Sequence, residues 1–232
     1  MKRPFSSLVL LPALVLASLT SAHAQLMLSG STQGVFAAPA VPFTTVNNGA
    51  VVSTFKTGAA IPFVGSQTAI TFTGDTFAGV GDGGSFDLGS VQIKNGWTFS
   101  GTAASYASMD LFIDLPAHGV SDFKLATLLF AITNNSAFLG LAPDVYYIGY
   151  TTPETLKVSD HLVNFELGFT NSAFAELPGV AIHEEHKAKV GLYATVQFTP
   201  VPEPSTYAAL AAFGLVGLVA LRRLRHPRRL AA

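Results

Sequence analysis

The sequence of 232 residues contains no cysteine. This absence excludes disulfide bonds, cysteine nucleophiles and thiolate metal sites. The stretch between residues 25 and 199 has the length of one domain and can bury a sizeable core without covalent cross-links. The lack of cysteine leaves open whether the protein folds in a reducing or an oxidising compartment.

Arginine is absent between Arg3 and Arg222. Residues 25–199 contain six lysines and thirteen acidic residues, which gives this part a formal charge of −7. Without guanidinium groups to bind phosphate, and with an acidic balance, the domain is not expected to bind nucleic acid. The charge fits a soluble surface best, and cations or neutral polymers are the partners it leaves open.

Long apolar runs occur only near the two ends of the chain. At the first end, the positively charged residues 2–3 precede an apolar stretch at residues 5–19, and Ala22 and Ala24 form a small-x-small cleavage site. This order predicts a secretory signal peptide over residues 1–24. A non-cleaved anchor is the less favoured alternative, because polar residues interrupt the run before the ~20 apolar residues that a bilayer needs.

At the other end, three segments follow one another. Residues 200–206 contain the sequence Pro202-Glu203-Pro204, whose prolines predict a stiff, non-helical linker. Residues 207–224 are mostly apolar and predict a single transmembrane helix of ~27 Å. Residues 225–232 form a basic tail, and the arginines in and before it predict a cytoplasmic cluster: Arg222, Arg223, Arg225, Arg228 and Arg229.

This order of proline-flanked glutamate, apolar segment and arginines resembles the PEP-CTERM sorting signal of Gram-negative bacteria. The resemblance implies that the chain is a substrate of exosortase, a membrane cysteine peptidase that recognises the Pro-Glu-Pro tripeptide and processes the tail. It also implies an exported protein that is anchored in the inner membrane before processing and then resides at the cell surface or in the extracellular matrix. An ordinary single-pass tail is the alternative.

Residues 25–199 alternate between apolar and polar side chains, which is the period of β-strands. The alternation is clearest at residues 110–115, 163–169 and 188–198. Further strands are predicted at residues 69–73, 90–94, 96–100, 123–133 and 145–149. Residues 30–65 are less regular and are interpreted as long loops around an edge strand. Short strands separated by turn residues predict an all-β domain, an antiparallel β-sandwich or jelly roll.

The order of several short segments resembles the choice-of-anchor K domain. These segments are Gly34-Val35-Phe36, residues 70–74, 85–96 and 109–113, Asp144-Val145, and residues 165–169 and 190–194. The resemblance implies an exported bacterial β domain that is joined to a surface anchor and has no established activity.

The segment His183-Glu184-Glu185-His186 combines two kinds of metal ligand. Its histidines are three residues apart and lead into a predicted strand, whereas the zinc-protease motif places them four apart on a helix. We interpret the segment as a solvated charged loop, with a metal site as the alternative.

Two other groups of carboxylates have competing interpretations. We interpret the glycine-rich residues 81–87, which contain Asp82 and Asp87, as a turn between strands, with a calcium loop as the alternative. Asp110 and Asp114 lie on one face of a predicted strand at ~13 Å, which is too far apart for the carboxylate pair of a glycosidase. We interpret them as part of a solvent-facing strand surface.

The sequence predicts no catalytic residue, no metal site and no cofactor. Trp97 and the tyrosines at 106, 146, 147 and 150 could stack on sugar rings if exposed, but aromatic residues in strands are more often in the core. The predicted function is a non-catalytic structural or adhesive role in the envelope or in exopolysaccharide. The alternative is an exopolysaccharide hydrolase whose carboxylates are brought together by the fold.

Overall fold

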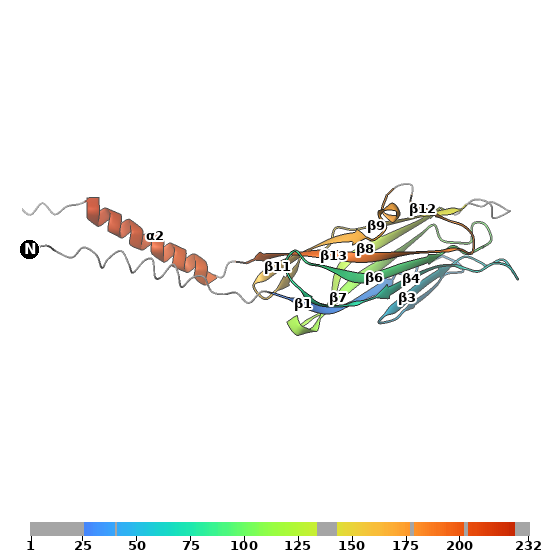
Figure 1. The fold of residues 1–232 in the computed structure, drawn as a ribbon, viewed down its shortest axis with the longest axis horizontal. Coiled ribbons are helices and arrows are strands. Elements are labelled where there is room, and N and C mark those ends of the chain that lie inside the picture. Colours follow the sequence, from blue (N-terminus) through green and yellow to red (C-terminus); the bar gives the residue numbers. More distant parts are fainter. Residues whose placement is uncertain (1–25, 40, 134–142, 177–178, 202–203, 226–232) are drawn as a thin grey trace, which may run out of the picture.

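The computed structural model describes residues 26–39, 41–133, 143–176, 179–201 and 204–225 (Figure 1). The predicted signal peptide lies outside these residues, as do the following residues of the predicted sorting and cleavage sites: Ala22, Ala24, Pro202, Glu203, Arg228 and Arg229.

The described residues of the domain form two antiparallel sheets. The six-stranded sheet has the order β12-β9-β8-β7-β1-β5. Its strands are β1 (Leu28–Phe36), β5 (Thr76–Val80), β7 (Tyr106–Leu115), β8 (Val120–Thr133), β9 (Asp144–Tyr150) and β12 (Val180–Ile182).

The seven-stranded sheet has the order β10-β11-β13-β6-β4-β3-β2. Its strands are β2 (Thr45–Asn48), β3 (Val52–Thr57), β4 (Thr68–Gly74), β6 (Ser85–Lys94), β10 (Leu156–Val158), β11 (His161–Phe169) and β13 (Lys187–Pro200). The helical elements are η1 (Pro116–His118), η2 (Ser172–Phe174) and α2 (Pro204–Arg225).

The two sheets enclose a common apolar core. Alternate residues of each long strand are buried, as the alternation in the sequence predicts. Aromatic rings from opposite sheets meet inside: Phe36 of β1 lies 6.0 Å from Phe55 of β3, and Phe77 of β5 lies 4.0 Å from Phe86 of β6, between ring centroids. The predicted antiparallel all-β fold is therefore confirmed, and face-to-face packing is the arrangement of a β-sandwich.

The interpretation of residues 30–65 as loops around an edge strand is wrong. These residues contain most of β1, which lies between β7 and β5, together with β2 and β3. The sequence of β1 is rich in small and polar residues because its neighbours leave little room. A Cβ atom at Gly34 would lie 2.5 Å from Met109 Sδ and 2.6 Å from Phe72 Cδ1. Glycine permits this close approach of backbone to core.

The strand predicted at residues 96–100 is also wrong. In this stretch only an isolated bridge between Thr98 and Ala60 has strand-like pairing among the described residues. The backbone of Gly96 passes so close to Gln67 and Ser66 that a Cβ atom would lie 2.3 Å from each of them. The chain turns at this contact and leaves the sheet.

The start of β1 and the end of β13 lie at the same end of the domain, which we call the proximal end. Leu28 pairs with Val80 just before the turn at residues 81–84, and Asp82 in that turn accepts a hydrogen bond from the backbone N–H of Phe198 at 2.7 Å. Figure 1 shows α2 beyond this end.

The opposite end of the domain, the distal end, carries the loop between β3 and β4, the loop between β6 and β7, and the loop between β12 and β13. Lys187 at the start of β13 pairs with Lys94 at the end of β6, which brings these loops together. In Figure 1 they lie on the side away from α2.

The C-terminal helix corrects two predictions. Residues 204–206 belong to α2 rather than to a non-helical linker, because proline is well suited to the first helical turn. The described residues contain no helix long and apolar enough to cross a membrane, so the predicted transmembrane helix at 207–224 is not supported. The uncharged stretch of α2 covers residues 204–221 before the exposed Arg222 and includes polar residues, against the ~20 apolar residues of a membrane span.

One hydroxyl group links the two sheets inside the domain. Thr32 of β1 is 4% exposed, and its Oγ1 donates to the backbone oxygen of Leu88 in β6 at 2.6 Å. Thr32 Oγ1 also accepts a hydrogen bond from the backbone N–H of Asp75 at 2.9 Å. Asp75 lies in the turn where the chain passes from one sheet to the other.

We predict that Thr32→Val destabilises the domain by about 1–3 kcal/mol, because the buried oxygen of Leu88 loses its donor while the side-chain volume is preserved. Urea unfolding of the exported chain measures this. Thr32→Ser keeps the hydroxyl and is the control. Equal stability of the valine and serine variants would contradict the assigned role of the hydroxyl.

Candidate functional site

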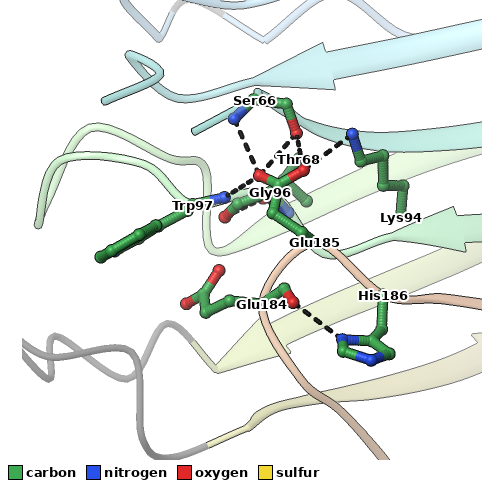
Figure 2. Close-up of polar contacts among 8 residues, drawn as sticks. All are labelled: Ser66, Thr68, Lys94, Gly96, Trp97, Glu184, Glu185 and His186. Atoms are coloured by element: carbon green, nitrogen blue, oxygen red, sulfur yellow. Dashed lines mark hydrogen bonds and ion pairs between the residues drawn. The ribbon is translucent and has the colours of Figure 1, made fainter. Parts of the chain in front are cut away.

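The densest group of polar contacts away from the core lies at the distal end (Figure 2). We call it the distal cluster, and it joins three loops and the end of β6. Its members are Ser66, Lys94, Asn95, Trp97, Glu184, Glu185 and His186.

A tight turn after β12 positions the two glutamates. The N–H of His186 donates to the oxygen of His183 at 3.0 Å, and Glu185 has a left-handed backbone with φ of 60°. Asn95 fixes this turn from the neighbouring loop: it accepts the N–H of Glu185 at 2.7 Å and donates its own N–H to His186 at 3.0 Å. The unusual backbone of Glu185 is therefore held on both sides by hydrogen bonds.

The side chain of Glu185 connects the three loops. Its Oε1 accepts from the backbone N–H of Ser66 at 2.8 Å and from that of Trp97 at 3.0 Å. Its Oε2 accepts from Ser66 Oγ at 2.8 Å and forms an ion pair with Lys94 Nζ at 2.9 Å. Figure 2 shows these partners converging on one carboxylate.

These contacts set the charge of Glu185. Partial burial alone would raise the pKa of Glu185, but hydrogen bonds from the N–H of Trp97, from Lys94 and from Ser66 outweigh it and lower the pKa to about 2. The folded state therefore favours the carboxylate form.

The neighbouring Glu184 has the opposite environment. Its Oε2 is buried and has no hydrogen-bond partner among the described residues. Burial, followed by the negative charges of Asp144 and Glu185, raises the pKa of Glu184 to about 7. Two adjacent acids in the sequence thus differ in charge near neutral pH.

Asn95 connects the distal cluster to the core. It is fully buried, its Nδ2 donates to the oxygen of Ile182 at 2.8 Å, and its Oδ1 accepts from the hydroxyl of Tyr146 at 2.8 Å. Burial, and then the nearby Asp144, raise the pKa of Tyr146, which keeps this hydroxyl protonated as a donor.

The predicted solvated loop at residues 183–186 is therefore only partly solvated. His183, Glu185 and His186 are exposed, but Glu185 binds the backbone of two other loops, and one carboxylate oxygen of Glu184 is buried. The rings of His183 and His186 lie 6.1 Å apart between centroids, in an edge-on arrangement. Among the residues that the structure describes, no group of three or more histidines or acids is placed to hold a metal ion.

The structure separates the other candidate carboxylates. Asp82 accepts a hydrogen bond from β13, whereas Asp87 lies exposed on the outer face of β6. The described residues therefore do not reproduce the cluster of oxygens expected for a calcium loop.

Asp110 and Asp114 share the outer face of β7, as the sequence predicts, and each is held by β8. Asp110 forms an ion pair with Lys124 at 2.8 Å and accepts from Thr127 Oγ1 at 2.7 Å. Burial would raise the pKa of Asp110, but these two partners outweigh it and the pKa is lowered. Asp114 accepts from the backbone N–H of Asp122 at 2.6 Å.

Two depressions of the surface bring together acids that are far apart in the sequence. One, of about 590 Å³, is lined by Asp75, Asp87 and Lys189 with several glycines and hydroxyl groups. The other, of about 420 Å³, is lined by Asp75 and Asp114 with small polar residues. Asp75 borders both, a position that the sequence did not indicate because it depends on the turn between the sheets.

The aromatic residues considered in the sequence have different positions. Tyr146 belongs to the core, Trp97 is half-buried and Tyr106 is 62% exposed. Three exposed phenylalanines in the distal loops, at positions 43, 63 and 99, were not predicted from the sequence. Apolar residues inside turn-rich segments, such as Pro62-Phe63, are the signal that could have indicated them.

Of the predicted sorting residues, Pro204 begins α2, and Arg222, Arg223 and Arg225 lie in its last turns. Residues 200–225 match the PEP-CTERM protein-sorting motif. Proteins with this motif are exported, anchored in the membrane before processing, and processed by exosortase, a membrane peptidase. The match confirms the resemblance that the C-terminal sequence indicated.

The sorting motif reaches the β domain only at Pro200, the last residue of β13. No curated protein matches the chain. The likeness of the β domain to the choice-of-anchor K family therefore stays a prediction.

We predict that Glu184→Gln stabilises the protein at pH 8 and has little effect at pH 4. The pKa of Glu184 is about 7 in the folded state against an ordinary value of 4.5, so the folded state binds more protons between these values and loses stability as the pH rises through them. Thermal unfolding at both pH values measures the difference. Glu166→Gln, on the outer face of β11, is the control.

We predict that Glu185→Gln changes the stability of the protein at pH 8 in the direction opposite to Glu184→Gln. The pKa of Glu185 is lowered to about 2, so its contribution to stability is present above pH 4.5 and is lost as the pH falls toward 2. The variant is expected to be less stable than the wild type at pH 8. If both substitutions changed stability in the same direction at that pH, the electrostatic assignment of the distal cluster would be wrong.

Proposed function

We propose that the chain is a non-catalytic component of the surface or extracellular matrix of a Gram-negative bacterium, with a structural or adhesive role on exopolysaccharide. The observation that carries this proposal is the use of the candidate acids within the fold. Asp82, Asp110, Asp114 and Glu185 each accept hydrogen bonds that hold a turn, a strand or a loop in place. Such carboxylates maintain a rigid surface.

The sorting motif supports the cellular part of the proposal. The Pro202-Glu203-Pro204 tripeptide would be the sequence that the peptidase recognises before it processes the tail. A signal peptide at residues 1–24 would bring the β domain across the inner membrane. A choice-of-anchor K-like β-sandwich would then be the exported part.

A hydrolase acting on exopolysaccharide is the second candidate. It is favoured by one observation: Asp75 shares one depression with Asp87 and the other with Asp114. The fold thus gathers a carboxylate from the β4–β5 turn and carboxylates from β6 and β7 at open surfaces lined with hydroxyl groups. A glycosidase needs two such groups on opposite sides of a sugar linkage.

One experiment separates the two candidates. The exported chain is mixed with exopolysaccharide from its native host, binding is measured by co-sedimentation, and polymer length is followed by light scattering. We expect saturable binding with unchanged polymer length. Shortening of the polymer that Asp75→Asn abolishes would establish the hydrolase instead, and absence of binding would contradict the adhesive role.

A further inference from the structure

A group of apolar side chains projects into solvent at the distal end. Phe43 is 58% exposed, Phe63 106%, Val64 58% and Phe99 50%. We call this group the aromatic tip. Most phenylalanines of the two sheets are buried, so the exposure of these three is a local property of the loops.

Hydrogen bonds hold the loops of the aromatic tip against one another. The backbone N–H of Phe99 donates to Ala59 at 2.9 Å, and that of Ile61 donates to Trp97 at 3.1 Å. Gln67 Nε2 donates both to the oxygen of Phe43 at 3.2 Å and to that of Gly58 at 3.0 Å. The exposed phenylalanines therefore come from one connected group of loops.

The backbone holds two of the rings in an unfavourable conformation. Phe43 has φ of 58° and Phe63 has φ of 67°, a left-handed region that bulky residues rarely adopt. The Phe63 ring is fully exposed, so burial in the core does not offset the strain. Strained backbone that displays an apolar ring is typical of binding surfaces.

Glu185 fixes two of the loops that carry the aromatic tip. It binds the backbone N–H of Ser66, next to Gly65 at the end of the β3–β4 loop, and that of Trp97, in the loop that carries Phe99. A rigid base lowers the entropy that a binding surface loses when it takes up a partner.

The size and charge of the aromatic tip indicate its partner. The exposed parts of its side chains amount to on the order of 500 Å², which is below the ~800 Å² per partner of a stable protein interface. The domain carries a formal charge of −7 over residues 25–199 and has no arginine there, which disfavours anionic polymers.

We infer that the aromatic tip binds a neutral polysaccharide. The C–H faces of sugar rings stack on the negative faces of aromatic rings, and the hydroxyl groups at the ring edges reach polar side chains. Thr98 and Ser100 supply such polar groups in the same loops. The inference rests on the proposed function and assigns its binding surface.

The test compares two substitutions of exposed side chains in the exported chain. Phe63→Gly removes the ring, and glycine readily adopts the left-handed backbone, so the thermal midpoint should stay equal or rise. Its affinity for the neutral fraction of the host exopolysaccharide should fall roughly three- to tenfold. Leu129→Ala, 48% exposed on β8, is the matched control and should bind like the wild type.

The outcomes are distinguishable. Failure of the wild type to bind the neutral fraction overturns the inference, and failure to bind any fraction overturns the adhesive function as well. Binding by the wild type with no loss in Phe63→Gly overturns only the assignment to the aromatic tip. A wild-type dimer in light scattering that Phe63→Gly converts to monomer, with polymer binding unchanged, would assign the tip to a second copy of the chain.

Discussion

The distal end of the domain depends on the carboxylate of Glu185. Three loops meet there beyond the ends of β4, β6 and β13, which are neighbours in one sheet. This side chain binds the backbone of two of the loops while its own backbone lies in the third. The ion pair with Lys94 connects the loops to the end of β6. This charged group therefore joins the two loops that carry Phe63 and Phe99, in addition to the backbone hydrogen bonds between them.

The adjacent Glu184 shows that this ordering depends on surroundings rather than on residue type. Glu185 is surrounded by donors, and its carboxylate is stabilised. Glu184 is affected by burial and by the negative charge of Asp144, and one of its oxygens has no hydrogen-bond partner among the described residues, so its charged form is destabilised. The stability that the turn gains from one acid is partly offset by the other.

The sequence predicted the features that depend on local pattern. Alternation along β7, β11 and β13 is a property of each strand alone, and the sorting motif is a continuous segment. The sequence did not indicate β1, because the need for a glycine at position 34 comes from the side chains of Met109 and Phe72 in other strands, which leave no room for a Cβ atom. It also did not indicate the contact of Glu185 with Ser66, since the two residues are 119 positions apart and only the tertiary fold brings them together.

The sorting motif begins at the proximal end of the domain, and the loops of the aromatic tip lie at the opposite end (Figure 1). This arrangement suits a protein that is anchored at one end and binds polymer at the other. Hydrogen exchange of the exported chain with and without the neutral exopolysaccharide fraction tests this account most directly. We expect polymer to slow exchange in the β3–β4 and β6–β7 loops. Protection confined to the outer face of β6 and β13, around Asp87 and Lys189, would contradict it.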